Sequence, residues 1–157
     1  MHRHKGFSLI ELLIVVAIIL VIAAIAIPSF LHSRIAANEA AAAAAVRTIN
    51  TAQISYNSAY PTTGFASSLA VLGGASCSAP SSTGACLIDQ VLAGGQRSGY
   101  SFALSNTSGT PASSYNVIAS PILSNYSGVR NFCSFEDAVL RGSMAAITAC
   151  DDSIPQQ

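Results

Sequence analysis

The chain carries a nearly unbroken apolar run close to its N-terminus, from Phe7 to Ile27. As an α-helix, these roughly 21 residues would be about 31 Å long, which is enough to cross the hydrocarbon core of a bilayer. The six residues before the run are short and basic, because they include Arg3 and Lys5. Positive charge favours the cytoplasmic side of a membrane. We therefore expect a single-pass segment with a cytoplasmic N-terminus and an exported remainder.

Three ordinary explanations compete for this apolar run. A secretory signal peptide would have a shorter apolar region and a cleavage site at its far end, but here the run continues through Pro28 into an alanine-rich stretch. A buried helix of a soluble protein would be shorter and less uniform. A plain membrane anchor accounts for the hydrophobicity, but it gives no reason for Glu11.

Glu11 is a carboxylate near one end of this spanning segment, where a charge is costly and marks function by default. Cleavage between Gly6 and Phe7 would create a new α-amino group four residues before it. In an assembly, that amine can neutralise Glu11 of a neighbouring subunit inside an apolar bundle. The alternative is a Glu11 that sits at the headgroup boundary or is protonated.

The string from Lys5 to Leu13, KGFSLIELL, resembles the prepilin peptidase signal of type IV pilins, a family that includes the pseudopilins of type II secretion systems. The resemblance implies cleavage after Gly6 and N-methylation of Phe7. Glu11 matches the family's glutamate at the fifth mature position, and Pro28 matches its signature proline. The strong resemblance covers residues 1–60, and weaker similarity continues into the C-terminal part.

This resemblance implies an α+β pilin fold with three segments: a leader over residues 1–6, a long helix over 7–59 and a globular head over 60–157. Residues 7–27 would form the transmembrane segment and later the filament core. The implied partners are identical subunits, prepilin peptidase, the pilus assembly machinery and membrane lipid. The implied location is the inner membrane before assembly and the extracellular pilus afterwards.

The helix is expected to continue past Pro28 to about Tyr56, with a kink or local melting near Ala24–Pro28, because proline lacks an amide hydrogen. Small alanines would let neighbouring helices approach closely. Glu39 is expected to be an ordinary solvated charge. One helical stripe should face the sheet of the head. This stripe comprises Val46, Ile49, Gln53 and Tyr56.

The composition changes at Tyr60, after which Ser, Thr, Gly and Pro become frequent. Two short helices are expected. One is capped by Ser67 or Ser68 and ends at residues 73–74; the other contains Leu87, Val91 and Leu92 and ends at residues 94–95. Strands in series favour an antiparallel sheet lying against the long helix. The expected strands are Tyr100–Leu104, Tyr115–Ala119, Asn131–Phe135 and Ala138–Arg141.

Four cysteines without a C-x-x-C spacing favour two disulfides in an oxidising compartment. Three pairings are possible. We favour Cys77–Cys86 and Cys133–Cys150, because both close short local loops. Two pairs depart from the single C-terminal pair that is common among type IV pilins.

Several functions are disfavoured by the sequence. Only 9% of the residues are charged, the formal net charge is zero and the arginines are scattered, so nucleic acid is not an expected partner. The only histidines are His2, His4 and His32, which leaves the head without a catalytic base of that type. We expect no enzyme, no cofactor and no metal. The acidic pairs at residues 136–137 and 151–152 can supply calcium ligands, but solvated turn charges are the simpler interpretation.

The favoured function is therefore a structural pilus subunit, with adhesion or twitching motility as a property of the assembled machine. A pseudopilin and a membrane-tethered adhesin remain the alternatives.

Overall fold

The structure is a computed structural model that describes residues 7–74, 77 and 79–157. It contains two compact units, which meet between Arg34 and Ile35. The first unit is the N-terminal part of helix α1 (Leu9–Ala59), and the second contains the rest of α1 and all other elements. The predicted α+β architecture, a long helix followed by an antiparallel sheet, is confirmed.

Helix α1 begins with a pair of reciprocal hydrogen bonds. The Ser8 hydroxyl accepts from the Ile10 amide at 3.4 Å, and Glu11 Oε2 accepts from the Ser8 amide at 3.0 Å. This arrangement is a form of the capping box, in which two amides without helical acceptors are satisfied together. A carboxylate in the first turn also complements the positive end of the helix dipole.

The helix continues across Pro28 without interruption. Proline has no amide hydrogen to donate to the carbonyl four residues earlier, so the Ala24 carbonyl lacks its usual helical partner. The local melting that was considered for Ala24–Pro28 is not seen, because every residue of this stretch remains helical.

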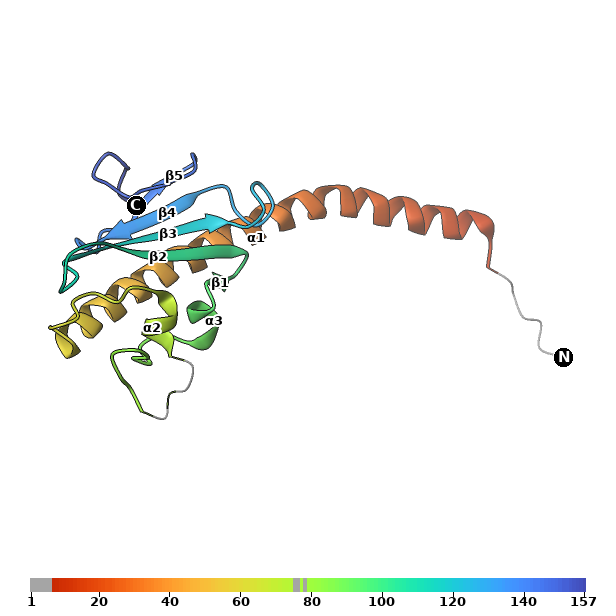
Figure 1. The fold of residues 1–157 in the computed structure, drawn as a ribbon. Helices are drawn as coiled ribbons and strands as arrows, with labels where there is room; N and C mark the ends of the chain where they lie inside the picture. The colour runs from red at the N-terminus through yellow and green to blue at the C-terminus, as the bar shows by residue number, and fades with distance from the viewer. Residues whose placement is uncertain (1–6, 75–76, 78) are drawn as a thin grey trace. The chain divides into compact units, whose positions relative to one another are not determined.

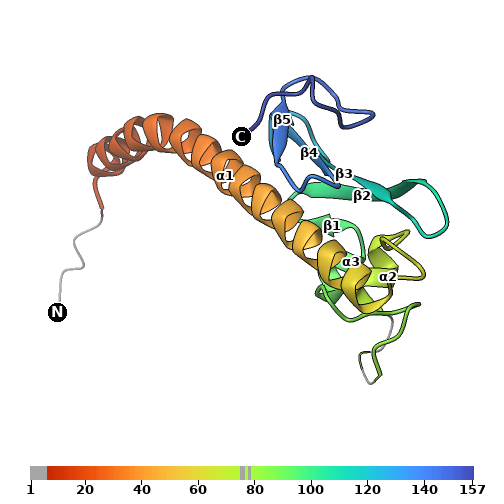
Figure 2. The ribbon, with the colours of Figure 1, turned by 90° about the vertical axis from the view of Figure 1, so that its left-hand side faces the viewer.

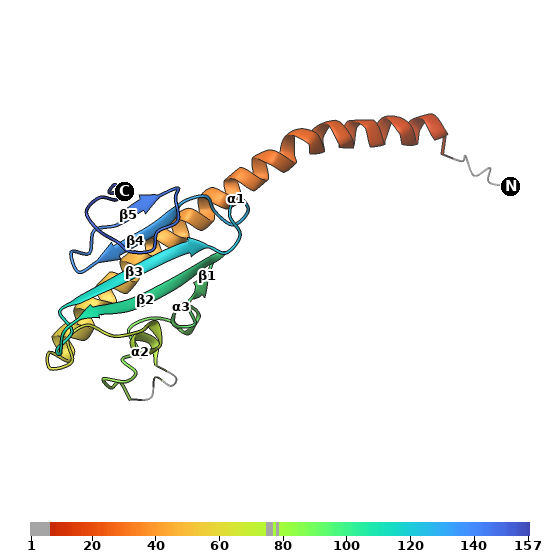
Figure 3. The ribbon, with the colours of Figure 1, turned by 45° about the horizontal axis from the view of Figure 1, so that its top comes forward.

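In the second unit, the C-terminal part of α1 packs along one face of the sheet (Figures 1 and 3). The stripe expected from the sequence is buried, with Val46, Ile49 and Gln53 fully inaccessible to solvent. Small side chains at Ala42 and Ala45 extend this contact surface toward the start of the unit. The aromatic and β-branched residues opposite belong to the strands. These include Tyr100, Phe102, Tyr115, Val117 and Phe132.

The sheet is an antiparallel meander in the order β1-β2-β3-β4-β5 (Figure 3). Its strands are β1 (Gln96–Arg97), β2 (Tyr100–Ser108), β3 (Ser114–Pro121), β4 (Asn131–Phe135) and β5 (Arg141–Ser143). Strand β4 has the predicted bounds, while β2 and β3 extend beyond theirs. The two-residue β1 was not predicted, because it is too short to show an alternating pattern.

The expected strand Ala138–Arg141 is wrong for its first three residues. Asp137 Oδ1 accepts from the Val139 amide at 3.0 Å, and Ala138 has a φ of 58°. An aspartate that binds the backbone two residues ahead forms a turn, which overrides the β propensity of the following residues. Strand β5 consequently begins only at Arg141.

Two short helices lie beside the end of α1 (Figure 2). Helix α2 (Leu69–Gly73) is capped by Ser68, whose hydroxyl accepts from the Val71 amide at 3.4 Å. Helix α3 (Gln90–Ala93) is capped by Asp89, which accepts from the Leu92 amide at 3.0 Å. The second helix therefore excludes Leu87, because the capping aspartate sets its start after that residue.

Two disulfides stabilise the head. Cys77 is bonded to Cys86 across a Cα–Cα distance of 5.5 Å, and Cys133 is bonded to Cys150 across 5.7 Å. The first closes the loop between α2 and α3. The second ties the buried centre of β4 to the segment that follows β5.

Candidate functional site: the apolar helix and the head surface

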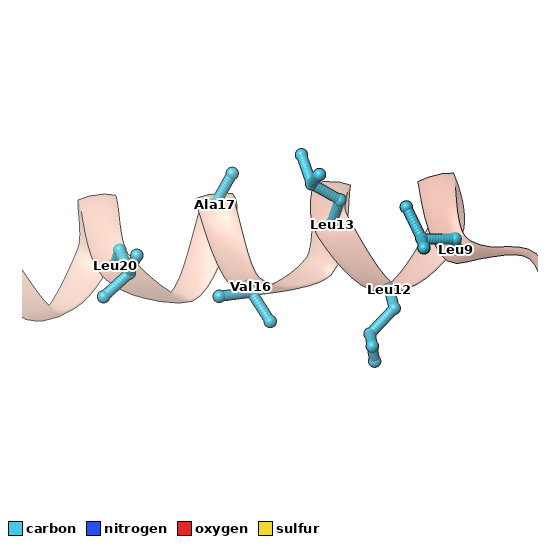
Figure 4. Close-up of a pocket in the computed structure, with 6 residues that line it drawn as sticks. All are labelled: Leu9, Leu12, Leu13, Val16, Ala17 and Leu20. Carbon is cyan, nitrogen blue, oxygen red and sulfur yellow. The ribbon is translucent and has the colours of Figure 1, made fainter.

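The first unit exposes an apolar helical surface. Its large apolar side chains from Phe7 to Phe30 have exposed fractions from 46% at Val16 to 79% at Leu9. Figure 4 shows six of these side chains projecting from neighbouring turns of α1: Leu9, Leu12, Leu13, Val16, Ala17 and Leu20. Among the described residues, α1 is the one helix long and apolar enough to cross a membrane. An apolar surface of this extent requires lipid or protein to cover it.

The residues expected to act in processing and assembly lie at the start of this surface. Gly6 lies outside the described residues, so the expected cleavage bond has no geometry here. Phe7 is 78% exposed, and Glu11 is exposed on the first turn. The contact between Glu11 and the Ser8 amide was not foreseen, although the spacing Ser8-x-x-Glu11 is a capping-box signal. Pro28 and His32 lie further along the same helix, and His32 is exposed.

Buried polar side chains of α1 fix the helix on the head. The side-chain amide of Gln53 pairs with the backbone of Ala66 as a neighbouring peptide group would. Its Nε2 donates to the Ala66 carbonyl at 3.0 Å, and its Oε1 accepts from the Ala66 amide at 2.8 Å. Asn50 donates to Ser134 Oγ at 2.9 Å and accepts from the Tyr115 hydroxyl at 3.2 Å. Burial raises the pKa of Tyr115, so its hydroxyl remains a donor at all ordinary pH values.

Near the start of the second unit, Glu39 has a structural role that corrects the expectation of a solvated charge. Its Oε1 accepts from the amides of Val129 and Arg130 at 2.9 and 3.1 Å. The adjacent Asn38 donates to the Ser127 carbonyl at 2.9 Å. Sequence reasoning missed both contacts, because their partners lie about 90 residues away along the chain.

Tyr100 completes this end of the head. Its hydroxyl donates to the Arg130 carbonyl at 2.8 Å. A Cβ added at Gly128 would lie 2.0 Å from the hydroxyl oxygen of Tyr100. Glycine is therefore required at position 128 to make room for the ring. Burial, reinforced by the charge of Glu39 and opposed by that of Arg130, raises the pKa of Tyr100 to about 12.

The acidic residues of the C-terminal segment surround a buried arginine. The Arg141 guanidinium is 2.7 Å from Asp137 Oδ2 and 2.6 Å from Asp152 Oδ1, and it stacks on the Phe135 ring. Burial acts to raise the pKa of Asp137, but hydrogen bonds from Arg141 and the Val139 amide outweigh it and hold that pKa below its usual value. Both aspartates thus pair with the buried arginine, while the Asp152 side chain remains 88% exposed to solvent. Within the described ranges, no cluster of three metal-ligating side chains occurs.

Comparison with known proteins finds one family model and two curated relatives. Residues 1–27 match the family model described as the prokaryotic N-terminal methylation motif. The type IV major pilin protein PilA of Myxococcus xanthus is 46% identical over 54 residues, which are 34% of this chain and 24% of that protein. The type IV wide pilus major component PilA4 of Thermus thermophilus is 56% identical over 39 residues, 25% of this chain and 30% of that protein.

The chain thus spans less than a third of the length of each curated relative that it matches. No solved structure matches it significantly. The methylation motif, the similarity to two pilins and the succession of a long apolar helix and an antiparallel sheet agree with one another. The chain carries the prokaryotic N-terminal methylation motif, and part of it is similar to part of two type IV pilins.

Proposed function

We propose that this chain is a structural subunit of a type IV pilus. The precursor crosses the inner membrane once, with its N-terminus in the cytoplasm. Prepilin peptidase cuts it between Gly6 and Phe7, and the new Phe7 amine is methylated. The pilus assembly machinery then transfers the chain into an extracellular filament, where the apolar half of α1 exchanges lipid contacts for contacts with identical helices.

One observation carries this proposal: an exposed apolar helix with a methylation motif at its start and Glu11 as its sole carboxylate before Glu39. In an apolar bundle, an unpaired carboxylate is heavily penalised. The Phe7 amine of a neighbouring subunit supplies the compensating charge, and this pairing favours one register of the helices. The head contributes a disulfide-bonded outer surface that suits an exposed fibre.

The test is mass spectrometry of filaments sheared from cells that express the full chain. An abundant chain that begins at N-methylated Phe7 is the expected result. A chain that is processed but confined to the membrane would indicate a pseudopilin. An intact leader over residues 1–6 in the cell would overturn the processing step and favour a tethered adhesin.

A further inference from the structure

Most charged side chains of the second unit are satisfied within the chain. Arg97 pairs with Asp89 at 2.9 Å, and Arg141 pairs with Asp137 and Asp152. Among the described residues of this unit, the arginines without a carboxylate at salt-bridge distance are Arg47 and Arg130. Because so few residues are charged, the positions of the unpaired arginines indicate where another molecule can supply a carboxylate.

Both arginines line one groove of about 400 Å³, which we call the basic groove. Its floor combines alanines of α1 with Phe132 and Leu140. Glu39 also lines it, but one carboxylate oxygen of Glu39 is occupied by two backbone amides. The Arg130 guanidinium lies 5.7 Å from the centre of the Phe132 ring, whereas Arg47 is exposed and has no hydrogen-bond partner for its guanidinium among the described residues.

A second pocket, of about 330 Å³, has the opposite charge, and we call it the acidic pocket. Its lining includes Asn116, Glu136, Asp151 and Asp152. Together with Asp137, these carboxylates outnumber the single guanidinium of Arg141 by three. Glu136 is exposed, with no ion pair in the described part of the chain.

The acidic pocket also contains an unsatisfied acceptor. Asn116 is only 9% exposed, and its Oδ1 has no hydrogen-bond donor among the described residues. A buried amide oxygen of this kind ordinarily has a partner. The carboxylates that line the pocket fit a guanidinium, which offers five N–H donors in a planar fork.

The two surfaces lie at opposite ends of β4. Arg130 directly precedes the strand and Glu136 directly follows it, so about 20 Å of extended chain separates them. Two different, complementary patches on one molecule can pair head to tail with the next copy. Such a contact propagates into an open helical assembly when the rotation between successive copies does not close a ring.

We propose that the acidic pocket of one subunit receives Arg47 from the basic groove of the next copy of this chain. This inference rests on the proposed filament function and assigns the contact between heads, as distinct from the contact between apolar helices. The alanines around Arg47 allow the second copy to approach closely. The exposed Glu136 carboxylate accepts the guanidinium protons.

Charge reversal with rescue tests the pairing in cells that express the full chain. R47E and E136R should each place like charges in the contact and lower the yield of sheared filaments by at least about tenfold. The double variant, which swaps the two charges, should restore filaments. Cells that co-express the two single variants should also recover, because every junction between unlike chains pairs opposite charges. R97E, the same reversal in an exposed ion pair elsewhere on the head, should leave the yield unchanged.

Each variant is checked for its amount in the membrane and for both disulfides, and R47Q replaces R47E if the reversal lowers that amount. Normal filaments from R47E, R47Q and E136R would overturn the head contact while leaving the filament function intact. Loss of filaments in the single variants without recovery in the double variant would also overturn it. If the wild-type chain is processed yet never enters the shear fraction, the proposed function and this inference fail together.

Discussion

At the residue scale, a few polar side chains determine how α1 sits on the head. Gln53 and Asn50 are buried within an otherwise apolar stripe, and each forms more than one hydrogen bond across the interface. Apolar contacts alone would tolerate small shifts of the helix along the sheet. Paired amides do not, because a shift would leave buried donors and acceptors without partners.

Replacing Gln53 with alanine should destabilise the head by at least about 2 kcal/mol, because it leaves the amide and the carbonyl of Ala66 unpaired in the core. Chemical denaturation of the detergent-solubilised chain, with both disulfides intact, measures this loss. Gln96→Ala is the matched control, since that glutamine is exposed in strand β1 and should change stability by less than about 0.5 kcal/mol. Equal midpoints for the two variants would contradict the role of Gln53.

Tyr100 should make the head sensitive to alkali. Its pKa is raised in the folded state from 10.0 to about 12, so the neutral phenol is favoured by folding. A raised pKa gives stability that is complete below pH 10 and is lost as the pH rises toward 12. Stability measured across this range should fall, and Tyr100→Phe should reduce the slope. An unchanged slope in that variant would assign the effect to another group, such as Tyr115.

At the element scale, the sequence predicts what local patterns encode. The apolar run, the stripe at Val46 and Ile49, the cap at Ser68 and the bounds of β4 each follow from residues close together in the chain. Contacts between distant segments were missed. Glu39 looked solvated because its partners at residues 129–130 become neighbours only after the sheet has folded onto α1. Likewise, nothing local shows that Asp152 reaches Arg141.

The disulfide between Cys133 and Cys150 is an element-scale constraint with a measurable effect. It joins β4 to the segment that carries Asp151 and Asp152, across 17 residues. Replacing both cysteines with alanine should cost about 3 kcal/mol in the chain-entropy model. The measurement is the shift of the denaturation midpoint relative to the oxidised wild-type chain, with the Cys77–Cys86 bond intact in both. Unchanged stability would show that the Arg141 ion pairs hold this segment without the bond.

At the scale of the whole molecule, the surfaces of the two units suit different surroundings. The head buries its apolar residues around the second part of α1, whereas the first unit exposes them throughout. A chain of this kind has no all-aqueous state that satisfies both units, because the apolar surface of the first requires lipid or protein to cover it. Under the proposed function, Glu11 is the charge on which transfer of this segment from lipid into a filament depends.

Two substitutions at Glu11 separate its two possible roles. Glutamine can still accept from the Ser8 amide and complete the capping box, but it cannot neutralise an amine. Alanine loses both functions. If charge pairing with the Phe7 amine drives assembly, E11Q and E11A should both abolish sheared filaments while the processed chain accumulates in the membrane. Asp89→Asn is the matched control, because asparagine caps α3 as well as aspartate does.

If E11Q assembles normally and only E11A fails, the role of Glu11 is to cap the helix, and the register of the bundle must be set elsewhere. The head contact through Arg47 would then be the remaining charge pair available to choose it. Combining E11Q with R47E decides whether the apolar helix or the head contact sets the register. A filament that survives each single change but not both would show that the helix and the head specify the same register redundantly.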